Sequence, residues 1–225
     1  MRKIIIPFFL IFSFVVVGQT PITKNLGDFS ILKIYNGIRV NLVKASAPKI
    51  IITGKNADRV KVKNNNGTLK ISLKFPNILA KKDINVTLNY TKQMRIIDAN
   101  EGASITCKNL RQNQVEIKAQ EGSFINISLQ TKHLTVKSVT GSVVKLSGAT
   151  DNQRVTVRNS GIYHGYNMKT KGATIVNATL GGKAEVSVKK TLEAIARVGG
   201  SVFYKGNPEV LKDKKSLGGV ISAKN

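Results

Sequence analysis

The chain is poor in several residue types on which other protein classes depend. Its 225 residues include one cysteine, no tryptophan, two histidines and 12 acidic residues, against 36 lysines and arginines. A single cysteine, Cys107, excludes an internal disulfide, so apolar burial and backbone pairing must stabilise the fold. The scarcity of acids and histidines leaves few groups from which an acid–base or metal site could be built. Apolar residues make up 41% of the chain, which is enough for a substantial core.

The N-terminus has the three parts of a secretory signal peptide. It reads MRKIIIPFFLIFSFVVVGQT, with a basic start, an apolar run, and residues suited to a cleavage site at Val16 and Gly18. The run from Ile4 to Val17 is shorter than the ~20 residues of a membrane-spanning helix, and no later segment is long enough to cross a bilayer. We therefore expect residues 1–18 to be a signal peptide, with an uncleaved anchor as the alternative. The mature chain is then exported to the periplasm, the cell surface or the medium.

The excess of basic residues suggests a class of partner. The formal charge is +24, and it remains +22 after removal of residues 1–18, which contain Arg2, Lys3 and no acid. Such a charge attracts polyanions. For an exported chain, nucleic acid is a poor candidate by availability, and anionic polysaccharide, lipopolysaccharide, a membrane surface or a surface protein are better ones. The alternative is that scattered lysines keep a β-rich surface soluble and discourage edge pairing.

A glycine recurs along the chain at intervals of 18 to 20 residues. The series consists of Gly102, Gly122, Gly141, Gly161, Gly181 and Gly199. The residues three and five places after each glycine form two nearly all-apolar columns, as the inward positions of a β-strand require. The first column reads Ile105, Ile125, Val144, His164, Ala184 and Val202, and the second reads Cys107, Ile127, Leu146, Tyr166, Val186 and Tyr204.

This repeat predicts an all-β solenoid with about 20 residues per coil. A unit of two or three short strands cannot bury its apolar face alone, whereas stacked coils can. A β-sandwich also gives alternation and regular turns, but it would not readily keep the same columns aligned through five intervals. Residues 19–225 are therefore interpreted as one solenoid domain. Residues 101–225 would form the regular coils, and residues 19–100 would form irregular strands that cap or begin the stack.

The first third of the chain also reads as strands. "NGIRVNLVK" and "NNNGTLKISLKF" place turns at Asn36-Gly37 and Asn66-Gly67, each followed by apolar alternation. "KFPNILAKKD" is the best candidate for an exposed loop, and its Lys81 and Lys82 are candidate binding residues for an anionic partner.

Both ends of the mature chain resemble one known family. The ending "VGGSVFYKGNPEVLKDKKSLGGVISAKN" is similar to the end of the putative auto-transporter adhesin family, also called the head GIN domain, a group of secreted bacterial proteins. "FSILKIYNGIRVNLVKA" and "GTLKISL" are similar to its opening strands. The resemblance implies a right-handed β-helix-like fold, export, and a role in adhesion or cell-surface binding. It supplies no catalytic residues.

His164 is the exception in the inward columns. Three interpretations are open: Ile162 takes the core place through a local bulge, His164 is a core histidine with its hydrogen bonds satisfied, or His164 forms a binding site with Tyr163 and Tyr166. The last reading makes Tyr163, His164 and Tyr166 candidate binding residues. Cys107 lies in the other inward column and is expected to behave as a small buried hydrophobe.

Three carboxylates form the single candidate metal site. Glu101 and Glu121 precede corner glycines on consecutive repeats, with Asp98 near them in sequence, and close carboxylates favour a cation such as calcium. The alternative is that they are solvated, with nearby lysines neutralising them. No other cofactor is expected.

The sequence favours a non-catalytic binding or adhesion solenoid. The alternatives are a polysaccharide-degrading enzyme that uses Asp98, Glu101 or Glu121 with calcium, and a periplasmic structural protein that acts by self-association. A glycosidase needs two carboxylates that flank one bond, and the remaining acids are spread over separate coils. The ligand and the oligomeric state are left open by the sequence.

Overall fold

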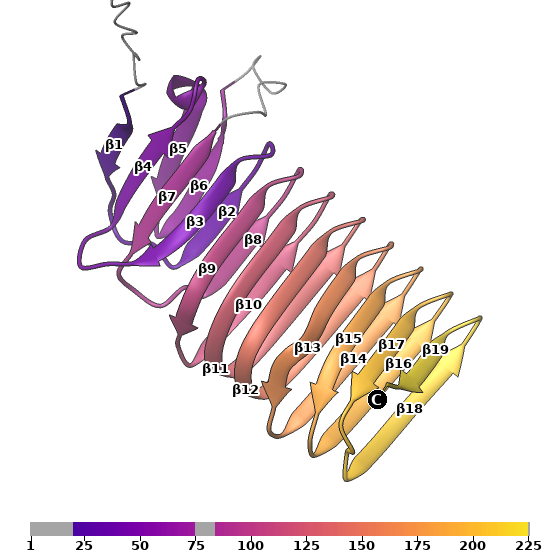
Figure 1. Cartoon of the computed structure of the whole chain (residues 1–225). Helices are drawn as coiled ribbons and strands as arrows, with labels where there is room; N and C mark the ends of the chain where they lie inside the picture. The colour runs from indigo at the N-terminus through magenta and orange to yellow at the C-terminus, as the bar shows by residue number, and fades with distance from the viewer. Residues whose placement is uncertain (1–19, 75–83, 225) are drawn as a thin grey trace, which may run out of the picture.

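The computed structural model describes residues 20–74 and 84–224, and nearly all regular structure in this part of the chain is β-strand (Figure 1). The expected signal peptide, residues 1–18, and the lysines Lys81 and Lys82 lie outside the described residues. The one helical element among those described is a short 3-10 turn, η1 (Ala57–Arg59). No described helix has the length and apolar composition needed to span a membrane.

The strands stack into two facing layers. The first layer runs, in spatial order, through β1 (Ile22–Asn25), β4 (Lys49–Thr53), β7 (Asn85–Tyr90), β3 (Arg39–Lys44), β9 (Ser104–Arg111), the first halves of β11 (Phe124–Val139) and β12 (Val143–Arg158), β13 (Ile162–Thr170), β15 (Lys183–Val188), β17 (Ser201–Lys205) and β19 (Val220–Ala223).

The second layer is built from the remaining strands. It runs through β5 (Val60–Asn65), β6 (Thr68–Leu73), β2 (Ile31–Ile34), β8 (Ile96–Ala99), β10 (Gln114–Ala119), the second halves of β11 and β12, β14 (Ala173–Thr179), β16 (Thr191–Arg197) and β18 (Val210–Ser216).

The parallel register confirms the predicted solenoid. Ile125 pairs with Val144, and Val144 pairs with Tyr163, so each residue lies beside one about 19 residues further along the chain. Inward side chains alternate with outward ones in each strand, and the inward ones join in one apolar core from Phe29 to Val202. The row of corner turns follows one edge of the stack (Figure 1).

Each corner is a two-residue turn in which both residues have positive φ. Glu101 and Gly102 have φ values of 53° and 71°, and the same pattern recurs in the following coils. Such a turn favours glycine at its second position, which explains most of the glycine repeat. The prediction was wrong at the fourth corner, where Asn159 and Ser160 occupy the turn and Gly161 follows it. Asparagine tolerates this backbone region, so the turn forms there without a glycine.

The residue after each turn packs against the neighbouring coil. At Gly161 and Gly200 an added Cβ would lie 2.0 Å and 2.1 Å from a carbonyl oxygen of the preceding coil. At the equivalent place, Ser123 and Ser142 donate hydrogen bonds to the carbonyls of Ala99 and Ala119. From the Glu101 corner onward, this position therefore holds only alanine, serine or glycine.

The N-terminal cap consists of β1, β4, β5, β6 and β7. In the cap, β4 pairs antiparallel with β1 and β7, and β5 pairs antiparallel with β6. Along the chain, one coil of the stack comes between β1 and the other strands of the cap. This coil consists of β2 and β3, and its Asn36-Gly37 corner stacks on that of Glu101. The chain then builds the rest of the cap and rejoins the stack at β8.

The last coil differs from those before it on its inner face. β18 is exposed along its whole length, and Asp213 and Lys215 pair with Ala194 and Ala196 of β16, which are buried. The Asp213 carboxylate and the Lys215 ammonium are 3.2 Å apart. Charged groups therefore stand where earlier coils carry core residues.

Candidate functional site

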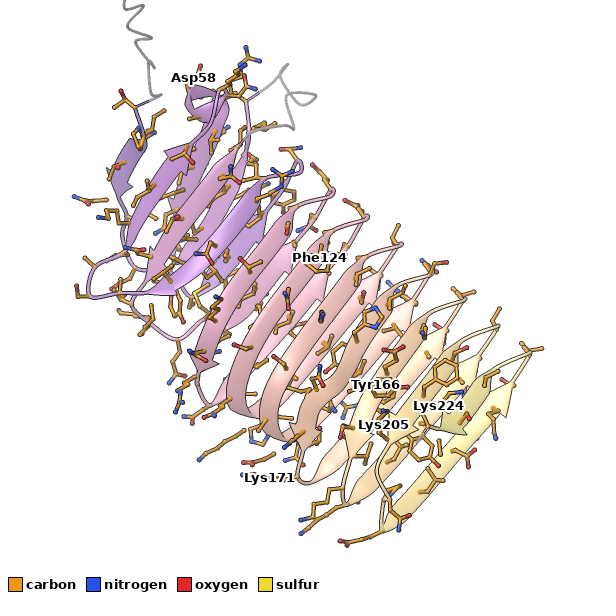
Figure 2. The ribbon with its side chains drawn as sticks, in the orientation of Figure 1. Asp58, Phe124, Tyr166, Lys171, Lys205 and Lys224 are labelled. Carbon is orange, nitrogen blue, oxygen red and sulfur yellow. The ribbon has the colours of Figure 1, made fainter. Side chains whose placement is uncertain are left out.

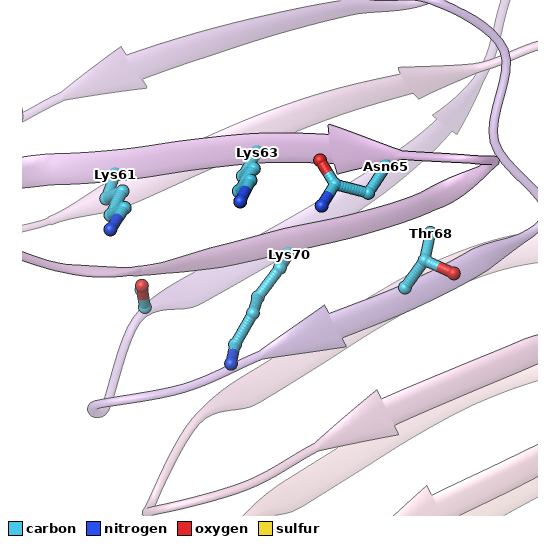
Figure 3. A pocket seen from close by; sticks show the side chains of 6 residues that line it. Lys61, Lys63, Asn65, Thr68 and Lys70 are labelled. Atoms are coloured by element: carbon cyan, nitrogen blue, oxygen red, sulfur yellow. The ribbon is translucent and has the colours of Figure 1, made fainter.

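A concave basic surface lies on the outer face of the β5–β6 hairpin. The two-residue turn at Asn66-Gly67 sets the pairing, so that Lys63 lies opposite Lys70 and Lys61 lies opposite Ser72. The side chains line a shallow groove of about 390 Å³ (Figure 3). Its lining consists of Lys61, Lys63, Asn65, Thr68, Lys70 and Ser72, which we call the lysine groove.

The lysine groove is strongly electropositive. Within residues 20–74 and 84–224, no carboxylate lies within ion-pair distance of Lys61, Lys63 or Lys70. The Lys70 ammonium lies 4.6 Å from the centre of the Tyr35 ring, which holds the charge beside the groove. Like charges placed opposite each other across a strand pair repel, so an anion between them would relieve the repulsion. Hydroxyl and amide groups from Asn65, Thr68 and Ser72 add hydrogen-bonding capacity.

The groove residues were not singled out from the sequence, although a signal was present. The Asn66-Gly67 turn was predicted, and a two-residue hairpin fixes the register of its strands. Counting outward from that turn places Lys63 opposite Lys70. The sequence analysis points to Lys81 and Lys82 instead, which are outside the described residues.

The structure separates the three predicted binding residues on β13. Tyr163, and not His164, takes the inward place beside Val144 and Ala184, and its side chain is fully buried. The hydroxyl of Tyr163 donates to the Gln153 side-chain oxygen at 3.1 Å. Ile162 is not the core residue of this coil either. The displacement of the turn to Asn159 and Ser160 explains the error, because it moves the side chains at the start of β13 to the opposite face, until a register shift after Gly165 returns Met168 to the core.

His164 and Tyr166 lie together on the outer face. The Nδ1 atom of His164 is 2.7 Å from Glu185, which also pairs with Lys183 at 2.7 Å. Burial by itself would raise the pKa of Glu185, but the hydrogen bonds from Lys183 and His164 outweigh it and lower the pKa below its usual value. Lys205 lies over the Tyr166 ring, 5.3 Å from its centre (Figure 2). The carboxylate in this cluster is already neutralised by two partners.

The predicted metal ligands do not converge. Glu101 and Glu121 do stack at neighbouring corners, where the amide of Gly102 donates to the Glu121 carbonyl. Asp98 instead lies on β8, between Lys33 and Lys118 at 4.0 Å and 3.9 Å, and it accepts a hydrogen bond from Asn100. In the described part of the chain, no three histidine, cysteine, aspartate or glutamate side chains gather to hold a metal ion. The Asp98 charge is balanced by lysines.

Cys107 is buried in the inward column, as the repeat predicts. Burial, as the larger influence, raises the pKa of its thiol, although a contact with the Tyr90 hydroxyl opposes the rise. A protonated, buried thiol is a poor nucleophile.

Several solved structures share this fold. A putative adhesin from Bacteroides fragilis is 18% identical with a TM-score of 0.79, and the match covers 92% of this chain and 98% of that one. Putative adhesins from Parabacteroides distasonis and Parabacteroides merdae, each 17% identical, have TM-scores of 0.68 and 0.61; the matches cover 92% and 93% of this chain and 98% of each of those. No curated protein matches the chain.

At these identities the solved structures establish the fold, and membership of a family rests on the sequence itself. A family model matches residues 28–208, which include the cap except β1, the lysine groove and all coils except the last. That match confirms the family that the sequence resembles, and it covers the opening segment and the first part, up to Pro208, of the closing one. The model is described as "Putative auto-transporter adhesin, head GIN domain", and the chain belongs to this family.

Proposed function

We propose that the protein is an exported, non-catalytic adhesion module that binds anionic groups of cell-surface glycans in the lysine groove. Family membership supports an adhesin-like role at or beyond the cell surface. The observation that carries the choice of ligand is the set of three lysines without a carboxylate partner among the described residues, beside hydroxyl and amide groups.

The groove suits carboxylated or phosphorylated sugars. Lysine ammonium groups bind such anions as point charges, without the planar geometry that arginine imposes. Asn65, Thr68 and Ser72 can donate to or accept from sugar hydroxyls. The groove is open along the hairpin (Figure 3), so it could accept an internal segment of a polysaccharide as well as a chain end. Anionic polysaccharide and lipopolysaccharide both offer this chemistry.

Binding to a glycan panel tests the proposal. The chain from Gln19 onward is measured against acidic polysaccharides, lipopolysaccharide and neutral polysaccharides, at low and physiological salt. We expect a subset of the acidic glycans to bind at both salt concentrations, because a shaped site depends less on screening than diffuse charge does.

A matched pair of variants locates the site. Lys61→Gln/Lys63→Gln/Lys70→Gln removes the groove charge, and Lys132→Gln/Lys189→Gln/Lys190→Gln removes the same charge from exposed positions elsewhere. The first variant should lose at least ~10-fold in affinity and the second should stay near the parent. Equal losses in both variants, or binding to every polyanion that vanishes at physiological salt, would contradict the proposal.

A further inference from the structure

An apolar ridge follows the corner turns of the last three coils. Leu180, Val198 and Leu217 occupy the first turn position, and their side chains are 51%, 44% and 78% exposed. The amides of Gly181 and Gly199 donate to the carbonyls of Val198 and Leu217, so the three residues stack on consecutive coils. Neighbouring coils are ~4.8 Å apart. We call these three residues the corner ridge.

Earlier coils carry polar residues at the same position. Reading along the stack, they are Asn36, Glu101, Glu121, Thr140 and Asn159. The change to apolar residues is therefore confined to one end of the edge. Along the row of corner turns in Figure 1, it occurs in the orange and yellow coils.

Neither the backbone nor solvation favours apolar residues at these corners. Leu180 and Val198 have a φ of 50° and Leu217 has a φ of 49°, a region that leucine and especially β-branched valine avoid. Asparagine, which the fold uses at Asn36 and Asn159, is better suited to the same turn. Three adjacent exposed apolar side chains that oppose folding point to an interaction surface.

Basic residues flank the ridge. Arg158 and Arg197 are exposed at the strand ends that lead into the corners, in register on either side of Thr179. Lys183 follows the Leu180 corner, and the nearest carboxylate in that strand, Glu185, is held by Lys183 and His164. None of the corner turns from Asn159 onward contains an acidic residue.

The shape and charge of the corner ridge favour a lipid surface over a protein as its partner. A single line of three side chains on a convex edge is far narrower than the ~800 Å² that each partner buries in a stable protein interface. A second copy of this basic chain would bring like charges together. A soft surface with anionic groups above an apolar layer matches both the apolar tips and the basic flanks.

We propose that the corner ridge inserts into the interface of an anionic phospholipid bilayer, with Arg158 and Arg197 at the level of the lipid phosphates. This contact is independent of the proposed glycan binding, because the lysine groove lies in the cap, at the other end of the stack (Figure 1). The protein would then hold a glycan at one end and a lipid surface at the other.

Vesicle binding with a matched variant tests the insertion. The chain from Gln19 onward is used, since an attached signal peptide would itself bind lipid, with vesicles of phosphatidylcholine alone or with a minor fraction of phosphatidylglycerol. We expect co-sedimentation with the anionic vesicles only. Leu180→Asn/Val198→Asn/Leu217→Asn should weaken it by at least ~10-fold, since burial of one large apolar side chain is worth about that factor or more.

The control removes three exposed apolar side chains from other places. Val43→Thr/Phe124→Thr/Val210→Thr changes strand positions with comparable exposure and should bind like the parent. Urea denaturation should show that the asparagine variant is at least as stable as the parent, because asparagine suits the turn. A weaker binding cannot then be attributed to unfolding.

The absence of tryptophan provides a second readout. Leu217→Trp introduces a single tryptophan at the ridge, and its emission should shift to the blue on addition of anionic vesicles, whereas that of Phe124→Trp should not. The shift should persist when Lys61, Lys63 and Lys70 are replaced by glutamine, which separates this inference from the glycan proposal. Sedimentation without a shift, unchanged binding of the asparagine variant, or ridge-dependent dimerisation in light scattering would overturn the proposal.

Discussion

The N-terminal cap and the coils that follow it are made of the same alternating strands, but they constrain their residues differently. In the coils, each strand has a parallel partner about 19 residues away, and the tightest contacts fall on the small residues after each turn. In the cap, hairpins pair strands antiparallel, and the residue after the β5–β6 turn is Thr68, where the coils from Glu101 onward have alanine, serine or glycine. The turn glycines themselves have open space in both regions, as Gly67 and Gly102 show. The coils are thus limited by packing between neighbours at the residue after each turn, whereas the cap hairpin is limited mainly by turn conformation and carries the open lysine groove.

The largest expected effect comes from adding one methyl group to each region. Gly200→Ala places a Cβ 2.1 Å from the Ala178 carbonyl oxygen of the adjacent coil, and the backbone must move to accept it. We expect a loss of about 3 kcal/mol in unfolding free energy, measured by urea denaturation. Gly67→Ala meets no atom within 4 Å and has a φ of 76°, so it should lose only about 1 kcal/mol through conformation. Equal losses of unfolding free energy in the two variants would show that close packing after the coil turns costs no more than the turn conformation of the cap hairpin.

Removal of one tyrosine hydroxyl from each region should give a smaller difference in unfolding free energy between the two regions. Burial raises the pKa of both Tyr163 and Tyr90, which are therefore neutral donors. Tyr163→Phe leaves the oxygen of Gln153 without this donor in the core of the coils, and should cost about 1–2 kcal/mol. The Tyr90 hydroxyl of the cap meets the sulfur of Cys107, a weaker partner, so Tyr90→Phe should cost less. The loss of stability is measured for both variants by thermal unfolding. A larger loss for Tyr90→Phe than for Tyr163→Phe would contradict the prediction.

The smallest expected effect is a dependence of stability on pH. The pKa of Glu185 is lowered in the folded state, so its pairs stabilise the fold above the usual value of 4.5, and this contribution is lost as the pH falls through the lowered value. Glu185→Gln should therefore be less stable than the parent by about 1 kcal/mol or less near neutral pH, and the difference should vanish in acid. The measurement is urea denaturation across this range.

Asp28 of the cap provides the contrast for Glu185. Hydrogen bonds from Lys92 and then Thr91 lower its pKa, but the carboxylate is exposed to solvent. The stability difference between the parent and Asp28→Asn should depend on pH in a way that added salt removes, whereas salt should leave most of the Glu185 effect in place. If added salt also abolished the pH-dependent stabilisation by Glu185, its pairs with Lys183 and His164 would be no better shielded from solvent ions than the pair of Asp28 with Lys92.

The coils could be predicted because their constraints repeat. The inward columns through Ile105, Ile125 and Val144 were recognised from spacing, as was the buried place of Cys107. The same method failed at Gly161, where a glycine at the expected interval hid the fact that Asn159 and Ser160 form the turn. A shift of one residue exchanges the two faces of a strand, so Tyr163 and His164 were interchanged.

The structure of the cap and the positions of the candidate site residues depend on contacts that do not recur along the chain, so the repeat does not predict them. The turn at Asn66-Gly67 was predicted, but the grouping of Lys61, Lys63 and Lys70 required the hairpin register to be applied to the outer face. The distance between Asp98 and the two corner glutamates could not be known, because the sequence does not show that Asp98 lies between lysines of two neighbouring strands. Outward residues carry little periodic signal, since solvent tolerates many side chains.

The ion pair on the inner face of β18 affects how the protein behaves at high concentration. A strand that added to this edge would cover Asp213 and Lys215, and the transfer of both charges out of water would cost more than their attraction returns. β18 therefore offers a poor template for growth by strand addition, even though its backbone groups are exposed at the edge. At high concentration the molecules should thus remain separate, without fusing into fibrils along this strand.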